Sequence, residues 1–231
     1  MILSKDCYLK ADCYRCNVAK KECEPFCQKL FKIDALLTNA MLTEKQKRNK
    51  IVLLRSGQDI SAQSRLVKYV KDITNWVQQG NNLYIHSSNC GNGKTAWSIK
   101  FIQEYIKAIW AKADVEDCRA LFVSVPKFLI ESKRSIGEFS EYADTVKKRV
   151  ANADLVVWDE IGSKAGTEYE IEILLNIIND RINNGKANIY TSNLPEDTLR
   201  VCLGERLYSR IVNLSDVCEF KNNDLRGKFK K

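Results

Sequence analysis

The sequence predicts an α/β fold in which a parallel β-sheet is flanked by helices and preceded by a small cysteine-rich segment. Short apolar runs at residues 83–86, 120–124, 155–158 and 187–191 have the character of strands buried on both faces. Longer segments with apolar residues at helical spacing separate these runs. Five cysteines lie within residues 7–27, ahead of the first run. We therefore expect one α/β core with a small N-terminal attachment.

Length and composition agree with this division. The 231 residues suit one ordinary domain plus a small module, and 45% hydrophobic and 29% charged residues are globular values. The net charge of +8 gathers at the two ends. Residues 1–50 hold eleven Lys and Arg against six Asp and Glu, and residues 221–231 hold five against one. Basic ends on a nearly neutral middle fit a polyanionic or acidic partner, or simply a soluble surface.

Targeting signals are not visible. No run approaches the roughly 18 apolar residues of a membrane helix. The start, MILSKDC, has no apolar core of a secretory signal. We expect a cytoplasmic protein with no membrane partner.

The cysteine-rich segment has the spacing of a metal site. A C-x2-C pair and a C-x3-C pair can each turn two thiolates onto one tetrahedral ion, and in a reducing compartment zinc is favoured over disulfides. The expected Zn²⁺ ligands are Cys13, Cys16, Cys23 and Cys27, with Cys7 as a spare that could replace one of them. An iron–sulfur cluster and unligated cysteines are the alternatives. So small a segment buries little core and would need the metal to fold.

We place the zinc-binding, partner-docking module at residues 1–37 and the core at residues 38–231. Segments 29–42 and 64–79 are expected to be helical, the latter ending at Gly80. Thr43 is expected to cap a short polar helix that follows it.

A phosphate-binding loop lies between the first strand and a long helix. Residues 82–97 read NLYIHSSNCGNGKTAW, a strand, a glycine turn and a helix start. Small residues let backbone N–H groups wrap phosphate oxygens, and the helix N-terminus points its positive end at them. Lys94 adds a charge at the β- and γ-phosphates of ATP, and the Thr95 hydroxyl is a ligand for Mg²⁺. The eight expected positions are Ser88, Asn89, Cys90, Gly91, Asn92, Gly93, Lys94 and Thr95. Ser88 stands where the usual pattern has its first glycine.

Two acids end the third strand. The run at 155–160 reads LVVWDE, and ligands bind at the carboxyl ends of strands in open α/β sheets. Asp159 would hold Mg²⁺, largely through water, and Glu160 would orient the attacking water. A solvated strand end is the alternative interpretation.

The later segments supply further candidates. Helices are expected at 128–134, 140–152 and 167–184, and a strand at 187–191. Asn193, at the tip of that strand, could contact the γ-phosphate or its water, although an Asn before Leu-Pro is also a common turn residue. Arg206 and Arg210 share one helix face and could offer a guanidinium to a phosphate, or pair with a carboxylate.

Taken together, the stretches SNCGNGKT, LVVWDE, TSN, GERLYSR and the terminal LRGK resemble AAA+ ATPases of the DnaC/DnaI helicase-loader family. The resemblance covers about the last 190 positions of the chain. It implies a RecA-like AAA+ P-loop core that binds ATP and Mg²⁺, hydrolyses ATP weakly as a switch, and has no C-terminal helical lid. It also implies that Asn193 is sensor 1, that Arg210 is an arginine finger acting on a neighbour's ATP, and that Arg226 is sensor 2. The cysteine cluster resembles the zinc module of the DnaI branch.

The partners implied by the resemblance are a hexameric replicative helicase within a primosome, single-stranded DNA, and further copies of the chain. Lys127, Lys133 and Arg134, with Phe128 as a stacking residue, are the expected DNA contacts. Two alternatives stay open: a transposition-helper ATPase of the IstB type, and a non-catalytic adaptor that sequesters a helicase. The small size suits a phage or mobile-element origin.

Overall fold

The computed structural model describes residues 27–51, 53–54, 57–135, 137–163 and 166–222, together with Cys7 and Leu9. Within this part of the chain, parallel strands form one sheet with the order β2-β3-β4-β1-β5. The strands are β1 (Asn82–His86), β2 (Ala120–Ser124), β3 (Leu155–Asp159), β4 (Ala187–Ser192) and β5 (Asp216–Glu219). The first four confirm predicted strands.

Strand β5 was not predicted from the sequence. It is an edge strand that pairs with β1, and only one of its residues, Cys218, is buried. Its sequence, DVCE, contains no apolar run, so the signal that marks the other strands is missing.

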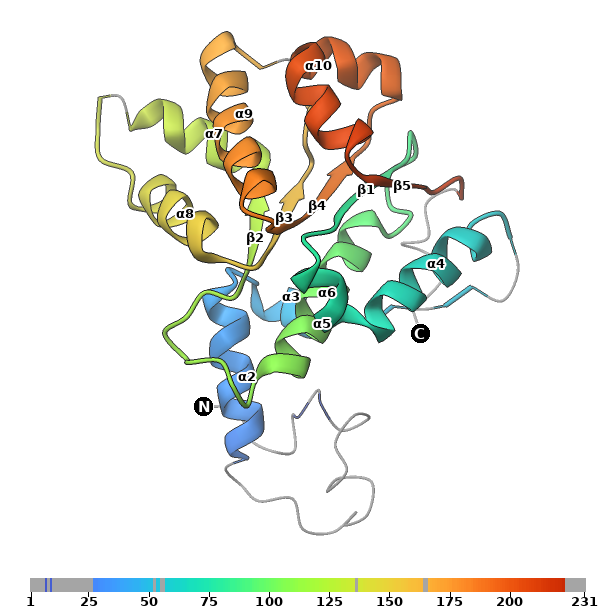
Figure 1. The fold of residues 1–231 in the computed structure, drawn as a ribbon, viewed down its shortest axis with the longest axis vertical. Coiled ribbons are helices and arrows are strands. Elements are labelled where there is room, and N and C mark those ends of the chain that lie inside the picture. Colours follow the sequence, from blue (N-terminus) through green and yellow to red (C-terminus); the bar gives the residue numbers. More distant parts are fainter. Residues whose placement is uncertain are drawn as a thin grey trace.

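Helices cover both faces of the sheet, as Figure 1 shows. On one face lie α2 (Gln28–Asn39), α4 (Ile60–Lys71), α5 (Ile73–Gln78) and α6 (Lys94–Ile109). On the other lie α7 (Val125–Arg134), α8 (Glu141–Asn152), α9 (Glu168–Asn183), α10 (Glu196–Tyr208) and the π-helical turn η3 (Ser209–Asn213). The short α3 (Glu44–Lys47) contacts α6.

The central strands are buried on both faces, as predicted. In β3, Leu155 and Val157 pack with α2, α5 and α6, whereas Val156 and Trp158 pack with α7 to α10. Each of these four side chains is fully buried. An unbroken apolar strand is therefore explained by two separate apolar layers, one on each side of the sheet.

Several helix starts are capped by side chains, and Thr43 confirms the predicted cap. Thr43 and Thr167 each form a capping box with the residue three positions later, and the Ser140 hydroxyl accepts a hydrogen bond from Ala143 N. The expected single helix at 64–79 is wrong. Two helices, α4 and α5, meet at Asp72, whose φ of −115° and ψ of 38° are not helical. The apolar spacing continues across the break, so periodicity alone could not reveal it.

Helix α2 runs across position 37, where the sequence suggests a module boundary, and its buried face packs in the core. Cys27 precedes α2 and is half-buried. Cys13, Cys16, Cys23 and Arg226 lie outside the described residues. No cluster of three or more His, Cys, Asp or Glu able to hold a metal occurs among the residues that are described, so the zinc site and the boundary remain predictions. The described helices include none long and apolar enough to cross a membrane.

Candidate nucleotide-binding site

The predicted phosphate loop joins β1 to α6 at the carboxyl edge of the sheet. Gly91 and Gly93 have φ values of 75° and 101°, in the left-handed region that favours glycine. Ser88 has no positive φ, so a serine fits where the usual pattern has glycine. Because α6 begins at Lys94, its N-terminal N–H groups open onto this loop.

The Lys94 side chain lies within the loop. Its Nζ donates hydrogen bonds to Asn89 O at 2.8 Å and to Asn92 Oδ1 at 3.0 Å. The Asn92 amide in turn donates to Ser87 Oγ. The ammonium is thus buried among loop oxygens, at the place where a phosphate would need it.

Asp159 lies at the end of β3 and accepts two hydroxyl hydrogen bonds on the same oxygen. Thr95 Oγ1 donates to Asp159 Oδ1 at 2.9 Å, and Thr191 Oγ1 donates to it at 2.6 Å. Burial raises the pKa of Asp159, and these two hydrogen bonds only partly offset it. A buried carboxylate and a hydroxyl are the hard oxygen donors that Mg²⁺ prefers, so this pair fits the expected ion.

Glu160 is exposed and has a left-handed backbone with φ of 60°. That conformation costs a non-glycine residue roughly 1–2 kcal/mol. Thr191 maintains it from the neighbouring strand: its Oγ1 accepts from Glu160 N at 3.0 Å, and its backbone O accepts from Ile161 N at 2.8 Å. Sequence reasoning missed Thr191, although its place in the TSN stretch beside the acid pair was a usable signal.

Asn193 is half-buried and follows β4 directly. The preceding Ser192 is anchored by a 3.0 Å hydrogen bond from its Oγ to Ile161 O, beyond the end of β3. Since β3 and β4 are adjacent, Asn193 lies at the same edge of the sheet as the acid pair. A role at the γ-phosphate remains a prediction.

Arg206 and Arg210 are both exposed and line one cavity of about 420 Å³ between α9 and the end of α10. Arg210 lies in the π-helical turn η3, a distortion that often marks functional sites. Glu205 pairs with Arg200 at 3.7 Å. None of the phosphate-loop residues 88–95 lines this cavity. The two arginines are therefore free to contact a second molecule.

The expected stacking role of Phe128 is wrong. Phe128 belongs to α7, and its side chain is 0% exposed. It packs in the buried layer that contains Val123 and Trp158. Its neighbour Lys127 is exposed and places its Nζ 4.1 Å from the centroid of the Tyr142 ring. The exposed aromatic of this region is Phe139, at 82% exposure in the connection from α7 to α8.

His86, at the end of β1, stacks on Tyr84 with the ring centroids 5.0 Å apart. Burial lowers the pKa of the imidazole, so it is neutral at physiological pH. Its backbone O accepts a hydrogen bond from Phe220 N. These contacts describe a packed histidine.

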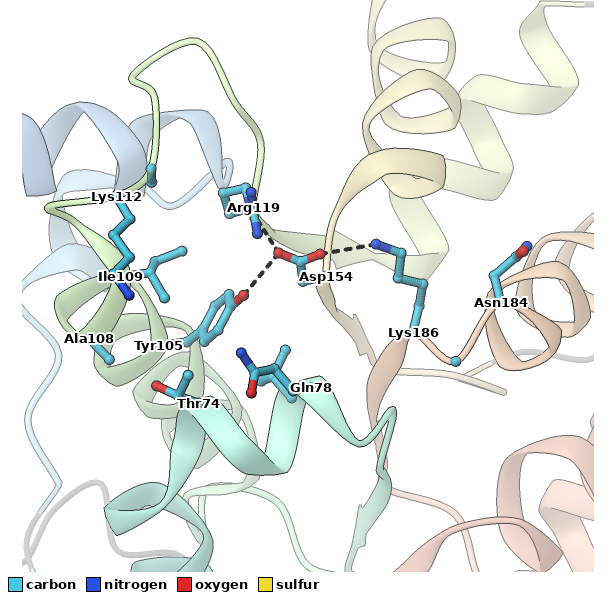
Figure 2. Close-up of a pocket in the computed structure, with 13 residues that line it drawn as sticks. Thr74, Gln78, Tyr105, Ala108, Ile109, Lys112, Arg119, Asp154, Asn184 and Lys186 are labelled. Carbon is cyan, nitrogen blue, oxygen red and sulfur yellow. Dashed lines mark hydrogen bonds and ion pairs between the residues drawn. The ribbon is translucent and has the colours of Figure 1, made fainter.

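A second polar cavity, of about 420 Å³, lies at the opposite edge of the sheet (Figure 2). Asp154 at its centre accepts hydrogen bonds from Arg119, Lys186 and Tyr105. Burial opposes ionisation of Asp154, but these hydrogen bonds and the Arg119 charge outweigh it and lower the pKa. Helices α5, α6 and α9 all end near this cavity, and their negative ends would repel a phosphate. We interpret the cluster as a structural tie, not as a nucleotide site.

The strand order, the glycine loop and the Thr95–Asp159 pair define a P-loop protein with an AAA+ type of core. The chain belongs to the family of IstB-like ATP binding proteins, whose model matches residues 29–231. No curated protein matches the sequence.

Solved structures share the fold at low sequence identity. The crystal structure of the DnaC helicase loader has a TM-score of 0.61 at 20% identity, over 78% of this chain and 100% of that one. The crystal structure of DnaI has a TM-score of 0.61 at 18% identity, over 78% and 95%. AMPPCP-bound DnaA from Aquifex aeolicus has a TM-score of 0.58 at 18% identity, over 80% of this chain and 53% of that one.

Proposed function

We propose that the protein is an ATP-dependent helicase loader. It would bind a hexameric replicative helicase and assist its loading onto single-stranded DNA during replication initiation, with weak Mg²⁺-dependent ATP hydrolysis as the switch. The ATP-binding family and the fold shared with the DnaC helicase loader support this proposal.

The site residues divide the work of the switch. Lys94 and the backbone N–H groups of residues 88–95 bind the phosphates, and Thr95 with Asp159 holds Mg²⁺, which neutralises phosphate charge when bound. Glu160 orients the attacking water. Asn193 and Arg226 sense the γ-phosphate, and Arg210 reaches the ATP of a neighbouring copy. The exposed carboxylate of Glu160, held in a strained backbone by Thr191, supports a catalytic and not merely a binding role.

The single observation that carries the choice of single-stranded DNA is Phe139. An exposed aromatic side chain can stack on a base, and base–aromatic stacking contributes roughly 1–3 kcal/mol per base. Bases in a duplex are already stacked on each other, so this contact favours an unpaired strand. Charge contributes less, because Arg134 pairs with Glu131 at 3.2 Å and Glu138 and Glu141 lie nearby in the chain.

A zinc-binding module at residues 1–37 would dock on the helicase, with Cys13, Cys16, Cys23 and Cys27 as ligands. The spacing of the cysteines supports this part of the proposal. Of the four, only Cys27 belongs to the described residues, where it lies half-buried at the start of α2.

The family description favours a second candidate, an IstB-type transposition helper that binds duplex DNA and recruits a transposase. Two measurements separate the candidates. A loader is retained by an immobilised replicative hexamer in an ATP-dependent way, and single-stranded DNA stimulates its ATPase. A transposition helper prefers duplex DNA and is not retained. A helicase-bound protein that never turns over ATP would instead be a non-catalytic adaptor.

A further inference from the structure

Asp59 is a buried carboxylate outside the nucleotide site. It lies in the turn before α4 and is 1% exposed. It occupies the N-cap position of α4, yet its side chain makes no capping hydrogen bond. Instead, Asp59 Oδ1 accepts from Lys221 N at 2.7 Å and Oδ2 accepts from Asn222 N at 3.2 Å. Both oxygens of a buried acid are thus used to hold backbone from the other end of the chain.

Residues 220–222, which we call the strap, continue β5 toward the phosphate loop. Phe220 is buried, and its N donates to the O of His86, the last residue of β1, at 2.9 Å. On the side away from Asp59, the carbonyls of Lys221 and Asn222 accept hydrogen bonds from Asn89 Nδ2 at 3.3 and 3.4 Å. Lys221 and Asn222 are therefore bound through their N–H groups to Asp59 and through their carbonyls to the phosphate loop.

Asn89 connects the strap to the lysine. The same residue that holds the strap through its side chain accepts the Lys94 ammonium on its backbone O at 2.8 Å. A continuous hydrogen-bonded route therefore runs from Asp59 through the strap and Asn89 to Lys94. The N–H of Asn222 and the carbonyl of Lys221 belong to one peptide group. Because Asp59 accepts from this N–H, it polarises the peptide and strengthens the Lys221 carbonyl as an acceptor for Asn89.

We propose that Asp59 is a positioning residue for nucleotide binding: it fixes the strap, and the strap fixes Asn89 and the mouth of the phosphate loop. This inference rests on the proposed ATP site and adds a residue that lies outside it. Without Asp59, the phosphate loop should be less ordered in the absence of ATP. ATP binding must then supply the free energy that orders the loop, so the affinity for ATP should fall. Turnover of bound ATP should not depend on Asp59, because the strap touches neither Asp159 nor Glu160 in the hydrogen bonds that hold it.

The chain offers a matched control on the same helix. Arg65 donates to Asp216 Oδ1 at 3.1 Å and to Val217 O at 2.6 Å, so it also ties α4 to β5, but away from the phosphate loop. Removing Arg65 should loosen the same pair of elements without freeing Asn89.

The test is ATP affinity measured by fluorescent-nucleotide titration on the full chain. Asp59→Ala, and Asp59→Asn as a variant of equal size, should raise the Kd for ATP about tenfold, with single-turnover hydrolysis of bound ATP within about twofold of wild type. Arg65→Gln should lower thermal stability and leave the Kd unchanged. In a double-mutant cycle, the variant that combines Asp59→Ala with Asn89→Ala should bind ATP no more weakly than the weaker of the two single variants. Both substitutions interrupt the same hydrogen-bonded connection, so their effects on the Kd should not add.

Three results overturn the inference: an unchanged Kd in a folded Asp59 variant, losses that multiply in the double variant, or an equal loss in Arg65→Gln. Wild-type protein that binds no ATP would overturn the proposed function instead, so the two failures are distinguishable.

Discussion

Thr95 and Asp159, 64 positions apart in the sequence, are joined by a 2.9 Å hydrogen bond from the threonine Oγ1 to the aspartate Oδ1. This contact links the first turn of α6 to the end of β3 and unites the two halves of the nucleotide site. The same aspartate oxygen also accepts from Thr191, so the geometry of the acid is set by two adjacent strands, β3 and β4, and by the start of α6.

Neutralising Asp159 should stabilise the protein without nucleotide. Burial raises the pKa of Asp159, so between its ordinary and its raised value the folded state holds a proton that the unfolded state has lost. Stability therefore falls as pH rises through that window, and at neutral pH the buried charge is unfavourable. Asp159→Asn should raise the free energy of unfolding by roughly 1 kcal/mol. Thermal unfolding should show that Asp159→Asn is more stable than the wild type at pH 7. This difference in stability should disappear when the measurement is repeated below the ordinary pKa of aspartate.

Asp154 is the matched control, because its pKa is lowered and the sign reverses. Its ionised form stabilises the folded state above the ordinary pKa of aspartate, and this stability is lost as pH falls through the lowered value. Asp154→Asn should therefore destabilise the protein at neutral pH. If both variants shift the melting temperature in the same direction, the assignment of Asp159 as a buried, unfavourable charge is wrong.

Two variants should separate ATP binding from hydrolysis. Lys94→Ala should abolish ATP binding, because the loop loses its cation at the phosphates. Glu160→Gln should bind ATP normally and lose turnover by about 10²-fold or more, because the water is no longer oriented. Equilibrium binding and steady-state ATPase assays check both. Lys100→Ala, which removes only the pairing with Glu104 on α6, is the control and should behave as wild type. Normal hydrolysis by Glu160→Gln would contradict the site.

The parts of this site that the sequence predicts are those held by local pattern. The glycine loop, the acids after β3 and the four apolar strands could be located because each lies within one stretch of chain. Asp59 could not, because its backbone partners are about 162 positions away and nothing in the local pattern marks it. Thr191 was missed because Asp159 is 32 positions away, although its place in the TSN stretch was a signal. Phe128 was misassigned for a related reason: helical spacing alone does not say which side of α7 meets the sheet.

Arg181 shows the same limit in the fold. It is 3% exposed and donates to the backbone oxygens of Val150, Ala153 and Ala187, so it joins the ends of α8 and the start of β4. Burial lowers the pKa of this guanidinium to about 10. An arginine in the last turn of a helix normally suggests a solvent-exposed cation near the helix dipole. Only the packing of α8 against α9 explains why this one is enclosed.

The purified protein should carry one Zn²⁺ per chain. Replacing Cys13 or Cys27 with Ser should release the metal, because a tetrahedral site needs four ligands. The core should still fold, since its hydrophobic layers lie on the sheet, while retention by the helicase should fail. Elemental analysis of protein prepared without chelators measures the metal. Cys118→Ser, at a half-buried thiol outside the segment, should keep it. A metal-free wild-type protein would exclude the module.

Phe139→Ala should weaken single-stranded DNA binding by roughly 1–3 kcal/mol while leaving ATP affinity unchanged, because the ring is exposed and supports no core. Fluorescence anisotropy with a labelled oligonucleotide measures this. Val201→Ala removes an equally exposed apolar side chain from α10 and should have no effect. Phe128→Ala should instead cost about 3–5 kcal/mol of stability, as loss of a buried aromatic does. Equal DNA affinity in Phe139→Ala would remove the observation that favours an unpaired strand.

The last prediction concerns assembly. A guanidinium that acts on a neighbour's ATP lies at a boundary between copies, so its removal should not disturb ATP binding by an isolated chain. Arg210→Ala should keep monomer ATP affinity and lose ATP-dependent self-association. It should also lose the hydrolysis that depends on assembly, on the order of 10³-fold in rate for such devices. Arg206→Ala, on the same cavity, is the comparison and should have a smaller effect, since exposed arginines commonly contribute little.

A mixing experiment decides whether Arg210 and Glu160 serve one composite site. Arg210→Ala chains have an intact ATP site but no finger, and Glu160→Gln chains present a finger but cannot hydrolyse. At an interface where the first type binds ATP and the second supplies Arg210, every required group is present, so turnover should return. A mixture that stays inactive although both variants fold and bind ATP would rule out a trans finger at Arg210. Full activity of Arg210→Ala alone would also rule out the trans finger, because hydrolysis would then not require the Arg210 guanidinium.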